Sequence, residues 1–258
     1  MIDSHCHLDF KDFDNCRDKV IEEARQAGVH TIVNIGVDLA TSKNSVALAE
    51  KYDLIYATVG VHPHDARTWN KDVKEELIRL AAHPKVKAVG EIGLDFYRDH
   101  SPRTVQRKVF AEQLEMAVQL KKPVVIHTRE AFDETVAMVK DYAPKLPGGV
   151  FHCFPGDVQD AYRVFDLGFL ISVGGVITFK NSLMSRVATE VPLEKMMLET
   201  DAPYVTPEPF RGKTNYPAYV IYTGRKLAEL KKLPFTEIEK ITDRTARKFF
   251  QLVPLFEG

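Results

Sequence analysis

The chain has 258 residues, of which 45% are hydrophobic and 28% are charged, and its formal net charge is -1. This balance is typical of a folded globular protein, so it excludes a disordered chain and a uniformly basic surface for nucleic acid or membrane. The length matches one α/β barrel, which commonly needs roughly 250 residues.

Eight β-like runs follow one another along the chain, and longer segments of helical periodicity separate them. This alternation is the pattern of βαβ units, and eight such units close into a (β/α)8 barrel, the TIM barrel. A doubly wound open sheet is the rival architecture, but no glycine-rich dinucleotide fingerprint follows the first run. The runs are MIDSHCH (1–7), HTIVNIGV (30–37), LIYATVGVH (54–62), VKAVGEIGLD (86–95), PVVIHTR (123–129), GVFHCF (149–154), FLISVGG (169–175) and KMMLETDAP (195–203).

Two segments illustrate the helices that we expect. VQRKVFAEQLEMAVQL (105–120) repeats apolar residues near helical spacing, which predicts a helix between the fourth and fifth strands. TEIEKITDRTARKFFQL (236–252) opens with Thr236 and Glu239 in capping-box spacing, which predicts an additional C-terminal helix packed outside the barrel. No repeat or change of composition marks a boundary, so we expect residues 1–258 to form a single barrel domain.

Ionisable residues gather at the predicted carboxyl ends of the strands, where barrels of this kind carry their chemistry. Six of the nine histidines fall there. Such a gathering of imidazoles and carboxylates at one barrel mouth favours a metal site over a set of unrelated polar residues. The residues are His5, His7, His62, His64, Glu91, Asp95, His127, His152, Glu199 and Asp201.

The carboxylates decide how many cations we expect. His5, His7 and Asp201 form one three-ligand set, and His127 with His152 form a second set that lacks a shared oxygen donor. Glu91 lies on the strand between them and is placed to bridge. Two cations roughly 3.5–4 Å apart would suit hydrolysis of phosphate esters, with a metal-bound hydroxide as the nucleophile. Zn²⁺ and Mn²⁺ fit these ligands best, and Mg²⁺ is a further candidate.

Two acidic residues of the last strand have candidate catalytic roles. Asp201 is expected to hold a metal and to act as the general base that takes the proton from the attacking water. Glu199 should point to the same side, since it precedes Asp201 by two residues. Three roles stay open for Glu199, namely orienting a water, holding a third cation, or accepting a hydrogen bond from a ligand histidine.

Several residues near the barrel mouth are candidates for substrate binding. The loop PEPFRGKTN contributes Arg211, Lys213 and Asn215 as an anion clamp, although a charged turn without function would look similar. His62 and His64 could donate to a phosphate, with His62 the favoured member because one of the pair could simply pack beside Pro63. The other candidates are Arg129, which could contact phosphate or pair with Glu130, and Tyr204 and Phe210, which could stack on bases or anchor the loop.

Seven motifs, in order and across nearly the whole chain, resemble the TatD family of metal-dependent deoxyribonucleases within the amidohydrolase-like barrels. They are SHCH, VGVHPHDA, GEIGLDF, IHTRE, FHCFPG, LETDAPY and PFRGKTN. The resemblance implies a TIM barrel, a divalent-metal centre and hydrolysis of DNA, often from the 3′ end, with DNA as the partner through single-stranded or frayed ends. It also implies that the metal ligands are His5, His7, Glu91, His127, His152 and Asp201. Wider relatives carry a carboxylated lysine where this chain has Glu91, which favours the TatD branch.

Three cysteines, Cys6, Cys16 and Cys153, fit no disulfide framework and favour a reducing cytoplasm. We find neither a signal-peptide pattern nor an apolar run of ~18 residues, so we expect no membrane contact, and no feature calls for an obligate protein partner. Two other functions compete with the deoxyribonuclease. One is a metal-dependent hydrolase of small esters, amides or aminoacyl-tRNA, and the other is a metal-stabilised binding module without enzymatic activity.

Overall fold

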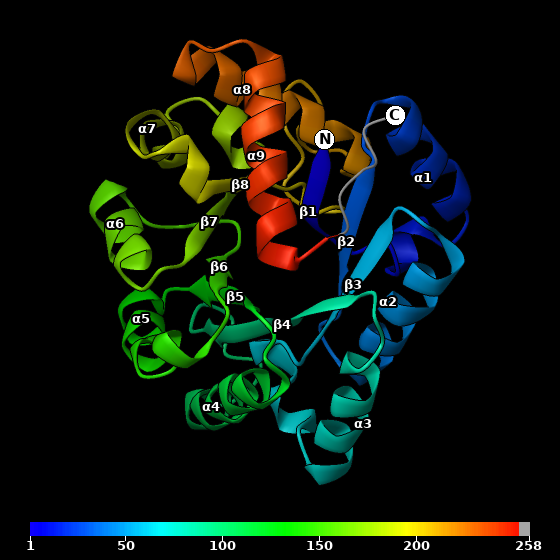
Figure 1. Ribbon diagram of the computed structural model, residues 1–258, viewed down its shortest axis with the longest axis vertical. Helices are drawn as coiled ribbons and strands as arrows, with labels where there is room; N and C mark the ends of the chain where they lie inside the picture. Colours follow the sequence, from blue (N-terminus) through cyan, green and yellow to red (C-terminus); the bar gives the residue numbers. More distant parts are fainter. Residues whose placement is uncertain (253–258) are drawn as a thin grey trace.

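Eight parallel strands form the centre of the fold, and helices surround them (Figure 1). The computed structural model describes residues 1–252. The strands are hydrogen-bonded in chain order from first to last, so the predicted TIM barrel is confirmed, and each of the eight runs contains a strand. They are β1 (Ile2–Cys6), β2 (Thr31–Ile35), β3 (Ile55–Val59), β4 (Val86–Asp95), β5 (Val124–Arg129), β6 (Gly149–Phe151), β7 (Leu170–Val173) and β8 (Met196–Leu198).

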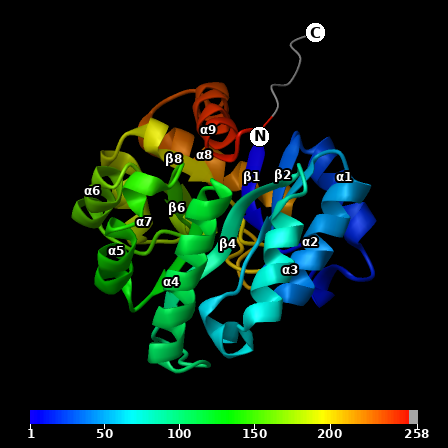
Figure 2. The same cartoon turned by 60° about the horizontal axis from the view of Figure 1, so that its bottom comes forward.

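The helices alternate with the strands and form the outer ring of the barrel, except for α9 (Figures 1 and 2). The helix expected over 105–120 is confirmed and begins two residues earlier. No helix within residues 1–252 is both long and apolar enough to span a bilayer. The helices are α1 (Arg17–Gln26), α2 (Leu39–Lys51), α3 (Lys71–Ala81), α4 (Arg103–Leu120), α5 (Phe132–Lys140), α6 (Val158–Asp166), α7 (Leu183–Glu190), α8 (Val220–Lys231) and α9 (Phe235–Phe250).

The barrel closes between β1 and β8 through a few contacts rather than a continuous ladder. A parallel bridge joins Cys6 to Ala202, and the backbone N–H of Asp201 donates to the carbonyl of His5 at 2.9 Å. The buried carboxyl of Asp3 accepts from the backbone N–H of Thr200 at 2.9 Å and lies 2.6 Å from the Thr200 hydroxyl. Burial raises the pKa of Asp3 to about 8, so this carboxyl is mostly protonated at neutral pH.

Helix α9 lies across the amino end of the barrel, beside the start of β1 (Figures 1 and 2). Ala246 and Phe250 of this helix pack with Val33 and Val125 in one buried apolar cluster. The predicted C-terminal helix is therefore confirmed, but it covers one end of the barrel and not its outside. The predicted capping box is wrong, because the helix begins at Phe235 after Pro234 and has no side-chain cap.

Two buried glutamines of α4 fix the carboxyl ends of the neighbouring strands. Gln106 accepts from the backbone N–H of Asp95 and donates to its carbonyl, each at 2.9 Å. Gln113 makes the same pair of bonds to Val61, at 2.7 and 2.9 Å. These bonds satisfy backbone groups where the strand ladder stops, so the loops that follow β3 and β4 are held in place behind the polar mouth.

Candidate metal centre

The two histidines at the end of β1 face the same point. The Nε2 atoms of His5 and His7 lie 3.3 Å apart, and both side chains are buried. The Nε2 atoms also lie 3.5 and 3.4 Å from Oδ1 of Asp201, which follows β8. The seam between β1 and β8 therefore brings these three residues together, as the sequence predicted.

Asp201 has a left-handed backbone, with φ of 55°. Aspartate tolerates this conformation at a modest energetic cost, because its short side chain can bond locally. Its N–H bond to the His5 carbonyl holds the turn against β1. The turn directs the carboxylate of Asp201 towards the two histidines of β1.

Glu91 of β4 lies between two pairs of histidines. Its Oε1 atom is 2.8 Å from Nδ1 of His127 and 2.8 Å from Nε2 of His152. Its Oε2 atom faces the other pair, at 3.4 Å from Nε2 of His5 and 3.9 Å from Nε2 of His7. One carboxylate thus presents one oxygen to each histidine pair, which is the arrangement that a bridging ligand requires.

A close approach of β4 and β5 places Glu91 beside His127. Gly93 lies opposite His127 in the register of the two strands, and its φ is 147°. A Cβ atom at Gly93 would lie 1.9 Å from the carbonyl oxygen of His127. Only glycine fits both the backbone conformation and the contact, so the second glycine of GEIGLD, Gly93, is required here for a structural reason.

His62 belongs to the same cluster. The sequence pattern indicates His62 only as a substrate contact. Its Nε2 atom lies 3.5 Å from Oε1 of Glu91, and its ring is 4.4 Å from the ring of His127. The Nδ1 atom of His62 accepts from the backbone N–H of His64 at 3.1 Å, which leaves Nε2 as the proton-bearing nitrogen. His62 is therefore within reach of a cation or phosphate beside Glu91.

The charges of this cluster depend on one another. Burial alone would raise the pKa of Glu91, but the imidazoles of His152 and His62 and the bond to His127 hold that pKa well below its ordinary value. Burial alone would lower the pKa of His152, but Glu91 and Glu199 raise it well above its ordinary value. Burial and the neighbouring His127 lower the pKa of His62. The carboxylates thus stay ionised and need positive charge beside them.

The donor set fits divalent cations. Groups of three ligand atoms lie within 4.8 Å of one another in three combinations, which are His5, His152 and Asp201; His5, His7 and Glu91; and His62, Glu91 and His127. Imidazole nitrogens together with carboxylate oxygens suit Zn²⁺ and Mn²⁺. Within residues 1–252 the buried Nδ1 atoms of His5 and His152 make no hydrogen bond. That of His152 faces the Oε1 atom of Glu199 at 3.7 Å.

Asp95 is a functional residue to which sequence reasoning assigned no role. Its Oδ2 atom lies 3.1 Å from Nε2 of His127 and 2.9 Å from Nε2 of His64. Its Oδ1 atom accepts from the backbone N–H groups of Tyr97 and Arg98, both at 3.0 Å. A carboxylate that holds the outer nitrogen of a ligand histidine fixes the ring and its tautomer. The one available signal was its place at the end of β4, four residues after Glu91.

Glu199 is completely buried, and both of its oxygens accept hydrogen bonds. The backbone N–H of Cys153 donates to Oε1 at 2.7 Å, and the hydroxyl of Ser172 donates to Oε2. The Oε1 atom is also 3.7 Å from Nδ1 of His152. Of the three roles that the sequence left open, these contacts favour an acceptor behind a ligand histidine, and direct catalysis by Glu199 stays a prediction.

The predicted substrate contacts lie around the mouth and differ in their exposure and in the side chains that they contact. Arg129 lies over the ring of Tyr97 at 3.9 Å, and Arg211 lies over the ring of Phe179 at 4.2 Å. Lys213 is exposed, as is Tyr204 at 53%. His64 is only partly buried and pairs with Asp95, as described above. These residues are free to meet a ligand outside the metal centre, and their substrate roles stay predictions.

Asn215 differs from the other residues of its loop, because it is completely buried. Its side-chain amide donates to the carbonyls of Thr200 and Tyr204, at 2.8 and 2.7 Å. Its Oδ1 atom accepts from the backbone N–H of Tyr216 at 2.9 Å. These bonds make Asn215 an anchor of the loop, so we do not include it among the proposed substrate contacts.

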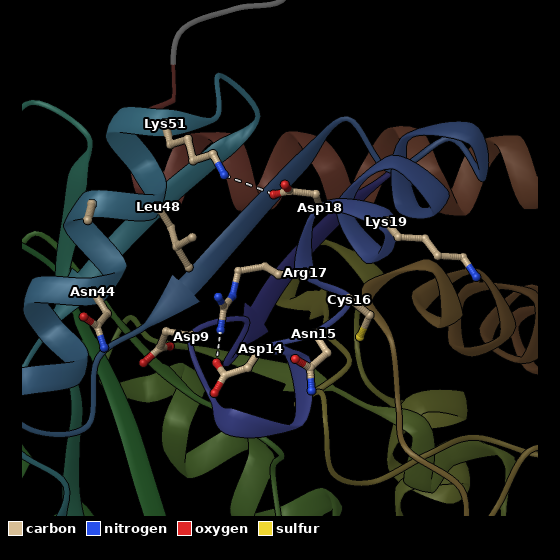
Figure 3. A pocket seen from close by; sticks show the side chains of 11 residues that line it. Asp9, Asp14, Asn15, Cys16, Arg17, Asp18, Lys19, Asn44, Leu48 and Lys51 are labelled. Carbon is tan, nitrogen blue, oxygen red and sulfur yellow. Dashed lines mark hydrogen bonds and ion pairs between the residues drawn. The ribbon is translucent and has the colours of Figure 1, made fainter.

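A cavity of about 720 Å³ lies away from this cluster (Figure 3). It runs between α2 and the segment from Asp9 into α1, and its charged side chains pair with one another. Arg17 lies 2.8 Å from Asp14, and Lys51 lies 3.1 Å from Asp18. None of the six predicted metal ligands lines this cavity, so its size does not make it the reactive site.

Comparison with known proteins agrees with the geometry. A family model described as TatD related DNase matches residues 2–251. An uncharacterized metal-dependent hydrolase, YabD of Bacillus subtilis, is 38% identical over 98% of this chain and 99% of its own length. The 3'-5' ssDNA/RNA exonuclease TatD of Klebsiella pneumoniae is 35% identical, with 97% of each chain covered. The crystal structure of YJJV, a TatD homolog from Escherichia coli, superposes with a TM-score of 0.92 at 34% identity, covering 98% of each chain.

Proposed function

The chain belongs to the TatD related DNase family of metal-dependent hydrolases, and we propose that it removes nucleotides from the 3′ end of single-stranded DNA. Support for this substrate comes from the relative named as a 3'-5' ssDNA/RNA exonuclease. A second line of support is the position of three cations at the end of the barrel that carries the buried carboxylates, since Arg129 ends β5 and Arg211 and Lys213 lie in the loop after β8.

The observation that carries the proposal is the position of Glu91 between two pairs of imidazoles. His5, His7 and Asp201 would hold one divalent cation and His127 with His152 a second, with Glu91 shared between them. Cations bound there would supply Lewis-acid chemistry, lowering the pKa of water and neutralising charge on the phosphodiester. A shared carboxylate would keep both cation sites close enough to act on one substrate phosphate, which suits displacement at phosphorus.

The chain's own residues then have distinct tasks. Asp201 is ionised, because its bond to His7 and the nearby His5 outweigh burial and lower its pKa. It would take the proton of the water that attacks phosphorus. The Nε2–H of His62 would donate to a phosphoryl oxygen beside Glu91. The bond from phosphorus to the 3′ oxygen of the preceding nucleotide would break, and that oxygen would take a proton from solvent water. The products would be a 5′ monophosphate and a strand with a new 3′ hydroxyl.

The test is digestion of an oligonucleotide labelled at its 5′ end, with Mg²⁺, Mn²⁺ or Zn²⁺ supplied in turn. A 3′ exonuclease should give a ladder that shortens one nucleotide at a time, and a phosphorothioate at the 3′ terminal linkage should delay it. Cleavage of p-nitrophenyl esters or aminoacyl-tRNA with the oligonucleotide left intact would instead favour the other hydrolase hypothesis. The expected cytoplasmic location stays a prediction from the three free cysteines.

A further inference from the structure

A second cavity, of about 440 Å³, opens on the carboxyl face of the barrel. Its walls come from the loops after β6, β7 and β8 and from the first turn of α7. Pockets of this volume are within the usual range for small organic ligands, about 300–1,000 Å³. The residues that shape it are Cys153, Phe154, Phe179, Ser182 and Arg211, with Lys180 at its edge.

This cavity adjoins the metal centre on the His152 side. Cys153 lines the cavity and directly follows His152 in the chain. Its backbone N–H donates to Glu199, the buried carboxylate behind His152, at 2.7 Å. Gly174 also lines the cavity, and a Cβ atom there would lie 3.5 Å from Oε1 of Glu199. The cavity therefore lies next to His152, whose Nε2 atom is 2.8 Å from Oε1 of Glu91.

The walls combine flat apolar surface with positive charge. Phe154 is buried in the wall, and Phe179 is partly exposed with the guanidinium of Arg211 over its ring. A ring covered by a guanidinium is a surface on which a nucleobase stacks well. Among the described residues that line the cavity none is acidic, while Lys180 and Arg211 are cationic. This lining favours an aromatic ligand that carries negative charge.

One polar atom in the wall lacks a bond. The buried hydroxyl oxygen of Ser182 has no hydrogen-bond partner in the part of the chain that the structure describes. Ser182 immediately precedes α7 but does not cap it with its side chain. A hydroxyl left unbonded at the edge of a ligand-sized cavity can donate to or accept from a base edge without preference for one base.

We propose that this cavity binds the nucleoside of the 3′-terminal nucleotide, the one whose 5′ phosphate is cleaved. The inference rests on the proposed function and deepens it by naming where the leaving nucleotide is held. A base can enter the cavity only after it leaves the stack and its pairing partner, so the cavity would select unpaired ends. The released nucleoside monophosphate would be a competitive product inhibitor.

The test combines one protein change with one substrate change. Two 5′-labelled oligonucleotides differ only at the 3′-terminal nucleotide, which either carries its base or is an abasic tetrahydrofuran analogue. The parent should cleave the normal substrate about 5- to 150-fold better in kcat/KM, which is the range expected for one stacked base. Phe179→Ala should bring this preference close to one, and Phe179→Trp should restore most of it because it restores a stacking surface.

Tyr162→Ala is the matched control, since Tyr162 is an aromatic residue on α6 that is 47% exposed and does not line the cavity. This variant should keep the parent's preference. Thermal unfolding of every variant shows whether a loss of preference reflects misfolding. If Phe179→Ala does not fold, Phe179→Trp still tests the pocket, because it keeps a stacking surface. Equal cleavage of both substrates by the parent, or an undiminished preference in Phe179→Ala, would overturn the proposed pocket.

Calorimetric titration with dAMP separates this inference from the proposed function. If the chain cleaves no oligonucleotide with any cation, the exonuclease proposal fails. Binding of dAMP that weakens in Phe179→Ala but not in Tyr162→Ala would then still support a nucleotide pocket. If oligonucleotides are cleaved while dAMP binding does not respond to Phe179→Ala, the pocket proposal fails and the exonuclease stands.

Discussion

The two ends of the barrel are built from the same strands and have opposite characters. At the amino end, Val125 of β5 and Val150 of β6 pack in an apolar cluster with Phe250 of α9. Two residues later in each segment, His127 and His152 face Glu91 in the polar cluster. Residues two apart on a strand share a face, so one inward-facing row changes from apolar to ionisable along its length.

This contrast separates stability from chemistry. Burying apolar side chains at the amino end stabilises the fold, whereas burying carboxylates and imidazoles at the carboxyl end costs stability unless cations or protons compensate their charges. A substitution at the amino end should therefore change stability but hardly change metal binding or activity, and a substitution at the carboxyl end should do the opposite. The following predictions test that separation in order of decreasing effect.

The largest effect should come from the amino end. Phe250→Ala removes a fully buried aromatic ring from the α9 cluster and should lower the free energy of unfolding by about 3–5 kcal/mol. Urea unfolding measures the loss, and Phe249→Ala is the control because the neighbouring ring is partly exposed. Metal content and kcat of the folded variant should match the parent. If the variant is fully folded but binds less metal than the parent, the two ends of the barrel are coupled.

Glu91→Gln should lower activity and leave the stability of the fold almost unchanged. It keeps the size of the shared ligand but removes its charge, so kcat/KM should fall by more than about 100-fold, exceeding the usual loss for a residue that only positions a ligand. Oligonucleotide digestion measures this, and circular dichroism should show an unchanged fold. Glu75→Gln on α3 is the control, because that carboxylate is largely exposed. A Glu91→Gln enzyme as fast as the parent would remove this cluster from the reaction.

Asp95→Asn should weaken metal binding by about 10- to 100-fold, because the amide holds His127 and His64 less firmly than the carboxylate does. Titration of the metal-free protein with Mn²⁺ measures the change. Asp99→Asn is the control, since Asp99 lies on the same loop and pairs only with exposed Arg103 among the described residues. If Asp95→Asn lowers kcat but leaves Mn²⁺ affinity unchanged, Asp95 acts on the substrate and not on the ligand.

The smallest effect should come from the exposed cations. Arg211→Ala and Lys213→Ala should each raise KM for oligonucleotides a few-fold and make the dependence of KM on salt concentration less steep, because each removes one contact with a phosphate. The measurement is KM between about 50 and 200 mM salt. An unchanged salt dependence in both variants would mean that this loop does not contact the strand.

The eight strands could be predicted from the sequence, and so could the convergence of the six residues proposed as ligands, because each of them lies at or just after the carboxyl end of a strand. Right-handed connections place consecutive strands side by side, and closure of the last strand onto the first brings together residues such as His5 and Asp201 that are far apart in the chain. That these residues bind metal stays a prediction, which the Mn²⁺ measurement tests. The position of α9 could not be predicted, because its amphipathic pattern shows that one face is buried but not against which surface.

Contacts across several elements were also out of reach of sequence reasoning. Asp95 holds two imidazoles and a loop at once, and only the fold shows this. The sequence pattern indicates Asn215 as a substrate contact because it lies in a charged loop. Its burial and its bonds to Thr200 and Tyr204 are set by tertiary packing, which the sequence does not show. The cavity around Phe179 likewise depends on three loops that are distant in the sequence.

Elemental analysis after equilibrium dialysis against Mn²⁺ tests the central claim most directly, that one glutamate is shared by two cation sites. We expect two Mn²⁺ per parent chain and less than one in Glu91→Gln, because both sites lose the same ligand. Two Mn²⁺ in both proteins, or none in the parent, would contradict it.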